Sequence, residues 1–469
     1  MKPYLKEIGV ILLGAFILCV PTFYNGFPIL CYDSATYIRS GFLGSVSIDR
    51  PLAYGLFIRH SSMSFSLWFT VYSQCIILSG LLYILLKNSI IKKEKFNFKY
   101  LFVLIVLIAL SNIGWSAAQI MADVFAPIFI ISFICFLLLE KLTVFNVVFL
   151  AFVFILGCAT HLTHLLMALV ASFTFLVAYF LFKKKIKNHI FYLKRILIVS
   201  LLAVVSLFTC LLINYTFKEG GGFRVSRGGH VFLMAHFIQT GTMEEFLKEN
   251  CDKPEFKGCK TCLYKDSLEH SLDQFLWTWN GTLDKTGGWA GTEQEYNFII
   301  GKMFSDVNFI IKNIYESFRF GLTQLFSTKV GDGISPMDKN SPPAVEINNY
   351  FHDELNTFLL SKQNTEPYLN KKLETINDYD TVLLIISGCG ILYYVFYKKN
   401  KNKEYFLGIL IIFFTLLNAF LTAGLNAPCP RFQARIAWLI PLFFAIIVFN
   451  NRTYILKVCK NLMLNPNNK

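Results

Sequence analysis

Ionisable residues recur beside the apolar runs of this chain, where charged groups are costly. The first run is followed by "ILCYDSATYIRSGFLGSVSIDRPLAYGLFIRHSS", residues 29 to 62, with two aspartates, three arginines and a histidine. Charged groups at membrane depth usually face a cavity or a substrate path. The candidates for chemistry in the whole chain are Asp33, Arg39, Asp49, Arg50, Asp123, His161, His164, Arg431 and Arg435.

Carboxylates and arginines together fit one kind of reaction. A carboxylate can deprotonate an acceptor hydroxyl or hold a divalent metal, and arginine forms paired hydrogen bonds with phosphate. We therefore expect Asp33, Asp49 and Asp123 to be catalytic candidates. Arg39, Arg50, His161, His164, Arg431 and Arg435 are the expected substrate or phosphate ligands.

Each of these residues also has a structural explanation. An arginine at a membrane interface commonly extends to the lipid headgroups, and Asp49 beside Arg50 can fix a turn before Pro51. The "HLTHL" segment places His161 and His164 on one helical face, which allows joint metal ligation but is more typical of interfacial hydrogen bonding. Their common placement favours a shared site.

The composition predicts the elements that must position these side chains. Of the 469 residues, 55% are hydrophobic and 16% are charged, and the mean hydropathy is +0.51. Such a chain is expected to be an all-α polytopic membrane protein. About ten apolar stretches could cross roughly 30 Å of hydrocarbon. They lie near residues 7–24, 67–86, 100–114, 117–139, 144–160, 163–182, 196–215, 380–397, 405–424 and 436–450.

The distribution of charge predicts the orientation. With ten spans, the segments on the side of the N-terminus hold 22 Lys and Arg residues, whereas the short loops on the other side hold five arginines. The positive-inside rule then places both termini in the cytoplasm of a plasma (inner) membrane protein. The net charge of +14 is explained by these anchors facing anionic lipid, and no nucleic-acid partner is expected.

The predicted spans divide the chain into three parts. Residues 1–215 form an N-terminal transmembrane module of about seven helices, with a functional outer loop at 25–66. Residues 216–379 form a large, mostly helical extracytoplasmic domain, and residues 380–469 form a module of about three helices. The segment 298–326 has near-helical apolar spacing, which suits either the membrane surface or the core of the outer domain.

Three of the twelve cysteines cluster in the outer region as "CDKPEFKGCKTC". In an oxidising exterior we expect two of Cys251, Cys259 and Cys262 to be bonded. A zinc site with His270 is a weaker alternative, and Cys429 is a candidate partner for the cysteine left over.

Two short motifs resemble a known class of enzymes. "DSATY" is similar to the acidic D-x-x-x-Y element in the first outer loop of GT-C membrane glycosyltransferases, such as protein mannosyltransferases and aminoarabinose transferases. "DRPLAYGLFI" resembles the stretch that leads into their interfacial helix. The resemblance implies that Asp33 is the base or a ligand of Mg or Mn, with Tyr37 as a neighbour that shapes the site. Asp123 is then either a metal ligand or a residue that supports the ligands from behind. Ser34 stands where the family commonly has a second carboxylate, so Asp49 remains a competing base.

The resemblance implies a sugar transfer from a polyprenyl-phosphate lipid donor to an extracytoplasmic glycan, lipid or protein. A transporter or flippase of lipid-linked or anionic substrates is one alternative, although its polar groups should then reach both membrane faces. A non-enzymatic membrane scaffold is the other. It would explain the cysteine-rich loop but not the charges of the first loop.

Overall fold

The computed structural model describes residues 2–90, 94–185, 188–217, 220–365, 368–397 and 403–464. Part of the predicted lysine-rich segments, at 91–93, 186–187 and 398–402, and the end of the tail lie outside these residues. Every regular element described is a helix, and one isolated β-bridge pairs Ile29 with Gln119. The prediction of an all-α protein is therefore confirmed for the described residues, and the apolar helices described below agree with a membrane protein.

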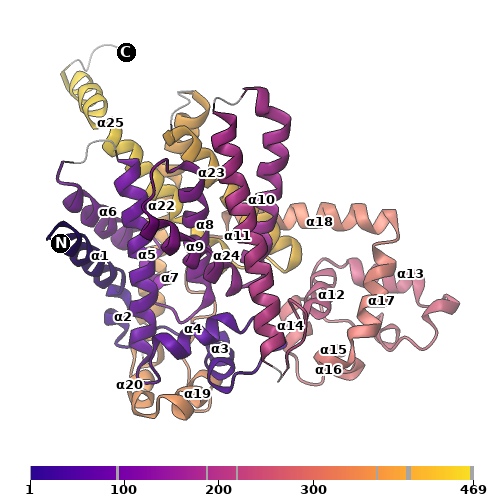
Figure 1. Ribbon diagram of the computed structural model, residues 1–469. Helices are drawn as coiled ribbons and strands as arrows, with labels where there is room; N and C mark the ends of the chain where they lie inside the picture. Colours follow the sequence, from indigo (N-terminus) through magenta and orange to yellow (C-terminus); the bar gives the residue numbers. More distant parts are fainter. Residues whose placement is uncertain are drawn as a thin grey trace.

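Most of the long helices form one bundle (Figure 1). Its helices are α1 (Lys2–Leu18), α2 (Val20–Asn25), α5 (Leu67–Ser89), α6 (Phe96–Leu110), α8 (Phe125–Leu138), α9 (Val144–Ala159), α10 (Leu162–Phe182), α11 (His189–Thr216), α22 (Tyr368–Leu392), α23 (Lys403–Leu425), α24 (Pro430–Ala437) and α25 (Leu439–Leu464). Shorter elements join them: α3 (Tyr32–Leu43), α4 (Ala53–Ser61), α7 (Ile113–Ala117), η1 (Ala122–Val124), η2 (Lys183–Lys185) and the π-helical turn η6 (Tyr393–Tyr397).

Seven helical stretches in the described chain are long and apolar enough to cross a membrane. They are Tyr4–Asn25, Leu67–Ser89, Leu162–Phe182, His189–Thr216, Leu369–Phe396, Lys403–Leu425 and Pro430–Asn451. Three shorter apolar helices, Phe96–Leu110, Ala122–Leu138 and Val144–Ala159, lie where three further spans are predicted. Helices suit this environment because their backbone hydrogen bonds are satisfied internally.

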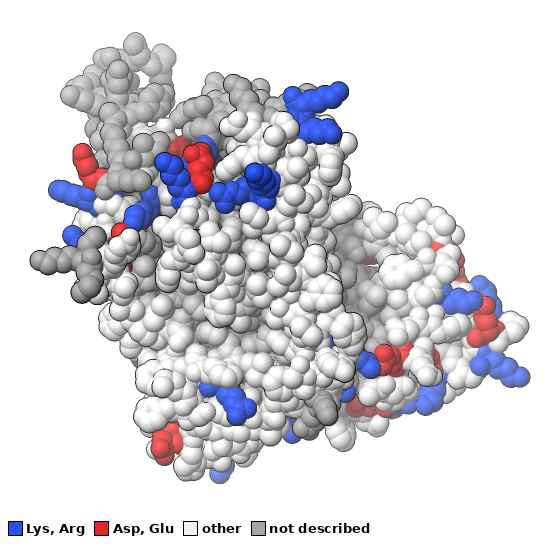
Figure 2. Space-filling view, in the orientation of Figure 1, with Lys and Arg blue, Asp and Glu red and all other residues white. Residues whose placement is uncertain are grey.

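Charged side chains are sparse around the middle of the bundle surface seen in Figure 2. Figure 2 shows Lys, Arg, Asp and Glu near one end of the bundle, at the opposite end and on the domain at its side, with a band of uncharged side chains between. This band is expected of a surface that faces lipid.

The region between α11 and α22 divides into two parts. The first, here called the side domain, has its own core of residues between Val231 and Phe309. Its helices are α12 (Gly229–Gln239), α13 (Thr242–Asn250), η3 (Pro254–Phe256), η4 (Thr261–Tyr264), α14 (Leu272–Trp277), α15 (Thr282–Thr286), α16 (Gly288–Gly291), α17 (Glu293–Met303) and α18 (Val307–Phe326).

The second part of that region returns to the bundle and shares its core. It contains α19 (Pro342–Tyr350), η5 (His352–Glu354), α20 (Leu355–Leu359) and α21 (Lys362–Thr365). Tyr350 stacks on Phe42 of α3 with ring centroids 4.5 Å apart, and the side chain of Gln363 binds the backbone of Leu30. The predicted domain of residues 216–379 thus divides because apolar residues of its second half find partners on the first loop. Its end also differs, since α22 begins at Tyr368 rather than near residue 380.

Candidate functional site

The first loop supplies Asp33 and Tyr37 from the start of α3. Ser34 accepts a hydrogen bond from the backbone N–H of Cys31 at 3.0 Å, which caps the helix. Asp33 lies in the first turn, where a carboxylate is favoured by the helix dipole. Tyr37 follows one turn later and is therefore on the same face of the helix.

The next helix crosses α3 at a glycine contact. A Cβ on Gly41 would overlap the carbonyl oxygen of Gly55 in α4, and one on Gly55 would lie 2.7 Å from the carbonyl oxygen of Tyr37. This close approach requires glycine on both helices. It brings the connecting segment, with Asp49 and Arg50, back beside Asp33.

Asp33 lies between two arginines that are far apart in the sequence. Nη2 of Arg50 donates to Oδ1 of Asp33 at 3.2 Å, and Nη2 of Arg431 donates to Oδ2 at 3.2 Å. Arg50 also binds Asp49 at 2.7 Å, and its guanidinium lies 5.0 Å from the centre of the Tyr37 ring. Asp33 is thus held from the first loop and from the start of the last membrane helix.

The same row of charges continues into the bundle. Asp123 lies in η1, and its Oδ1 accepts a hydrogen bond from Nη1 of Arg435 at 2.6 Å. Its Oδ2 lies 3.5 Å from Nε of Arg431. Arg435 also donates to Asn418 of α23 at 3.1 Å. Three carboxylates and three guanidinium groups therefore alternate in one chain of ion pairs. We call it the charge chain, and its order is Asp49, Arg50, Asp33, Arg431, Asp123 and Arg435.

The electrostatics of Asp33 follow from its two partners. Burial by itself would raise the pKa of the Asp33 carboxyl, but the guanidinium groups of Arg50 and Arg431 together hold that pKa below its ordinary value. The adjacent carboxylates raise the pKa of Arg50 against the effect of burial. Asp33 is therefore an ionised carboxylate at neutral pH.

The two histidines have different positions. His161 caps α10, where its Nδ1 accepts from the backbone N–H of Thr163 at 3.2 Å. His164 is fully buried behind it, with Nδ1 3.1 Å from the carbonyl oxygen of Gly157. Of the two, only His161 borders the cavity described next.

A cavity of about 570 Å³ lies over the charge chain. Asp33, Tyr37, Asp49, Arg50, Asp123, His161 and Arg431 border it. Arg435 lies beneath Asp123 with 1% of its side chain exposed, and Arg39 is exposed elsewhere on the far part of α3. The structure thus gathers seven of the ten predicted site residues around one space and leaves out Arg39, His164 and Arg435.

The side domain forms the opposite wall of this cavity. Phe232 of α12 and Leu276 and Trp277 of α14 border it, and the ring of Trp277 lies 5.7 Å from that of Trp289. Asp273 and Asp332 also line the space, and neither was a predicted site residue. Asp332 lies in a glycine-rich turn, a sequence context that predicts only a linker. The local sequence therefore gives no indication that Asp332 lines this cavity.

The residues present do not fit a divalent metal between Asp33 and Asp123. Both carboxylate oxygens of each aspartate already face a guanidinium group. Within the part of the chain that the structure describes, no three His, Cys, Asp or Glu side chains form a metal-binding group. Guanidinium groups therefore contact the carboxylates that the resemblance offers as ligands of Mg or Mn, and a role for either metal stays a prediction.

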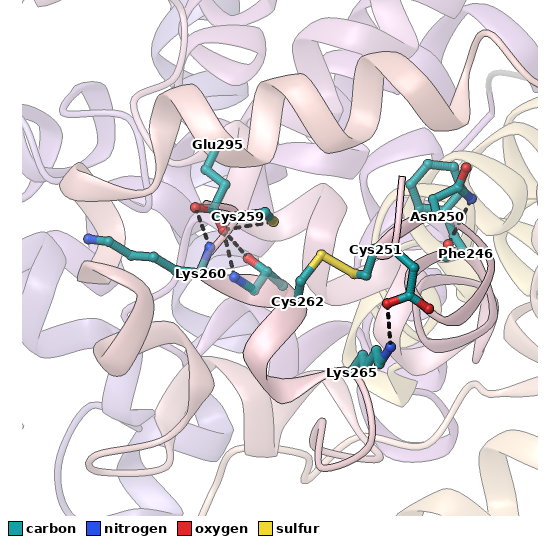
Figure 3. The surroundings of a disulfide bond; sticks show 10 residues. Phe246, Asn250, Cys251, Cys259, Lys260, Cys262, Lys265 and Glu295 are labelled. Carbon is teal, nitrogen blue, oxygen red and sulfur yellow. Dashed lines mark hydrogen bonds and ion pairs between the residues drawn. A yellow bond between two sulfur atoms is a disulfide. The ribbon is translucent and has the colours of Figure 1, made fainter. Parts of the chain in front are cut away.

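The cysteine cluster of the side domain forms a disulfide between Cys251 and Cys262 (Figure 3). Cys259 is free, and its Sγ lies 3.5 Å from Oε1 of Glu295. The backbone N–H of Lys260 donates to Oε2 of the same carboxylate, and that of Thr261 donates to Oε1. Cys429, the other predicted partner, donates instead to Asp332 at 2.8 Å. These contacts stabilise a loop of the side domain and do not gather around His270.

Comparison with known proteins adds no relative: no family model, no curated protein and no solved structure matches the chain.

Proposed function

We propose that this protein is a GT-C-type membrane glycosyltransferase, which transfers a sugar from a polyprenyl-phosphate-type donor to an extracytoplasmic acceptor. One observation carries the proposal: Asp33, with Arg50 and Arg431 on its two oxygens, borders a cavity between a membrane-helix bundle and a side domain. A transferase that uses a lipid donor and an extracytoplasmic acceptor needs a carboxylate and phosphate ligands at such a boundary.

Arg431 is the proposed ligand of the donor phosphate. Its Nε and Nη2 face Asp123 and Asp33, whereas its Nη1 has no carboxylate within ion-pairing distance in the described part of the chain. A phosphate that binds Nη1 would compete with Asp33 for the same guanidinium. The binding of the donor would then weaken one of the two ion pairs that keep the pKa of Asp33 low.

Asp33 is the proposed base. The acceptor hydroxyl attacks the anomeric carbon of the sugar while its proton passes to the Asp33 carboxylate. The bond between that carbon and the phosphate oxygen breaks, and its electron pair remains on the phosphate, where Arg431 stabilises the charge. In this proposed step, Asp33 takes the proton and Arg431 stabilises the phosphate, without a metal ion. The apolar wall of Phe232, Leu276 and Trp277 would exclude water and contact the sugar or the lipid.

The proposed setting is the plasma membrane, with ten spans and with both termini in the cytoplasm. The side domain and the cavity then face the exterior, where a lipid-linked donor and a glycan, lipid or protein acceptor would meet. Bilayer lipid is the other expected partner. A transporter is less favoured because the charge chain lies on one side of the bundle and ends at the buried Arg435.

The test is Asp33→Asn in purified protein supplied with a panel of synthetic polyprenyl-phosphate sugars and a cell-envelope extract as the source of glycan, lipid and protein acceptors, with release of the lipid phosphate as the readout. We expect a loss of at least about 100-fold, the usual contribution of a general base. Arg39→Gln is the matched control, because Arg39 is a charged residue of the same helix outside the cavity. The transfer rate of this variant should stay within about twofold of that of the native protein. Full activity of Asp33→Asn, or no release from any donor by the native protein, would contradict the proposal.

A further inference from the structure

The helix α18 carries a row of exposed apolar side chains. Its members recur every three or four residues and therefore share one face of the helix. Their exposed fractions range from 42% at Leu322 to 81% at Phe326. The row comprises Val307, Ile311, Ile314, Phe318, Leu322 and Phe326. Such a row is far more apolar than the solvent-facing side of a helix in a soluble domain.

The opposite face of α18 is buried against protein and contains polar groups. Gln324 is fully buried and exchanges two hydrogen bonds with the backbone of Cys429, at 2.8 and 2.7 Å. Asn313 is also buried on this side, next to the apolar Phe309. The buried face also includes the apolar Phe309 and Phe320, so both faces of α18 carry large apolar side chains. A helix at the surface of a soluble domain would instead have polar groups on its exposed face.

The position of α18 indicates what covers the exposed row. The helix packs along α23, one of the seven membrane-length helices, where a Cβ on Gly321 would overlap the ring of Phe420. Phe318 stacks on Phe420 with ring centroids 5.4 Å apart. The exposed row is therefore continuous with the lipid-facing surface of the bundle.

The figures agree with this placement. Figure 1 shows α18 running outward from the bundle along the upper edge of the side domain. The other helices of that domain lie below α18 in this view. In Figure 2 the charged side chains of the side domain gather away from this edge.

We propose that α18 lies in the membrane interface, with its exposed apolar row in the acyl chains of the leaflet next to the side domain. The ligand of this surface is bilayer lipid. Ion pairs mark the polar border of the helix, between Lys312 and Glu245 and between Arg319 and Glu316. Because Phe309 of α18 packs on Phe246 of the side-domain core at 5.0 Å, the same helix holds that domain against the membrane surface. The proposal is independent of the chemistry in the cavity.

A photo-crosslinking experiment tests this placement. The full chain is reconstituted in nanodiscs of phosphatidylcholine and phosphatidylglycerol, with a benzophenone amino acid in place of Ile314. The matched probe replaces Asp252, whose side chain is 86% exposed on the side domain. We expect at least tenfold more lipid adduct, measured by mass spectrometry, at position 314. Equal adduct at the two positions, or a crosslink from position 314 to a second copy of the chain, would overturn the proposal.

A second measurement tests whether the apolar row itself causes the contact with lipid, or whether α18 only lies near the bilayer. With the benzophenone at position 326, the double change Ile311→Glu and Ile314→Glu should lower the lipid adduct at least fivefold, because two carboxylates oppose burial in acyl chains. Asn308→Glu, on the exposed border of the helix, should leave the adduct within twofold. An unchanged adduct in a monodisperse double variant would show that the row does not face lipid.

Discussion

At the scale of single residues, the charge chain contains carboxylates in two different environments. The side chain of Asp33 is 31% exposed and borders the cavity, whereas that of Asp123 is 6% exposed and faces a guanidinium group on each oxygen. Buried charges persist only when they are paired. We therefore expect Asp33 to act on a ligand and Asp123 to position Arg431 and Arg435.

The first prediction concerns Asp123→Asn. This change leaves the buried guanidinium of Arg435 without its anionic partner, and removing one member of such a pair costs about 3–5 kcal/mol. The free energy of unfolding in detergent should fall by that amount, as followed by thermal melting. Asp33→Asn should cost clearly less, because Asp33 is partly exposed and Arg50 keeps Asp49 as a partner. Equal losses for both variants would contradict the division of roles.

The second prediction concerns pH. The pKa of Asp33 lies below its ordinary value of about 3.9. A group with a lowered pKa in the folded state contributes its full stability above that ordinary value and loses it as the pH falls through the folded pKa. The difference in melting temperature between the native protein and Asp33→Asn should be constant from pH 7 to pH 5 and shrink below about pH 4. A difference that already shrinks near pH 6 would show that burial, rather than the two arginines, controls the pKa of Asp33.

At the scale of elements, the crossing of α3 and α4 sets the geometry of the site. Gly41 and Gly55 let the two backbones approach closely, and the segment between the helices then returns Arg50 to Asp33. The glycines of the "RSGFLGS" and "LAYGLF" segments thus have a positional role that neither segment reveals alone.

Gly41→Ala tests this role. The added methyl group would overlap the backbone of α4 and should cost about 1–3 kcal/mol of stability. A displacement of about 1 Å between Asp33 and its partners should lower transfer by roughly 100-fold. Gly301→Ala in α17 is the control, since a Cβ there meets no atom within 4 Å, and it should stabilise the protein by about 0.5–1 kcal/mol. Normal melting and activity of Gly41→Ala would exclude a strict requirement for glycine at the crossing.

At the scale of the whole molecule, the chain closes a cavity between parts that are distant in sequence. The first loop, the start of α24 and the side domain each contribute a wall. The disulfide between Cys251 and Cys262 stabilises the side domain and is expected where the surroundings are oxidising. This placement agrees with an extracytoplasmic side domain.

The orientation can be tested by labelling intact cells with a membrane-impermeant maleimide. Lys260→Cys in the side domain should react from outside, because the positive-inside rule predicts that the lysine-rich connections at the opposite end of the bundle lie in the cytoplasm. Lys184→Cys, between α10 and α11, should react only after the cells are lysed. The reverse pattern would invert the predicted topology and place the cavity in the cytoplasm.

The sequence by itself determined the membrane class, the helical content and the identity of most candidate groups. Apolar runs and the chemistry of Asp and Arg are local properties and need no partner. Even part of the site was readable at this level. Tyr37, four residues after Asp33, shares its helical face, whereas Arg39, six residues after it, does not.

Only the tertiary structure decided which charges meet. Arg431 reaches Asp33 across 398 positions of the chain, and Arg435 reaches Asp123 across 312. Two groups so far apart can be brought within hydrogen-bonding distance only by the packing of helices, which no local pattern encodes. The same packing placed arginines on both oxygens of Asp33, returned residues 330–365 to the bundle and turned the apolar row of α18 outward. Each outcome depends on the surfaces left open by distant helices.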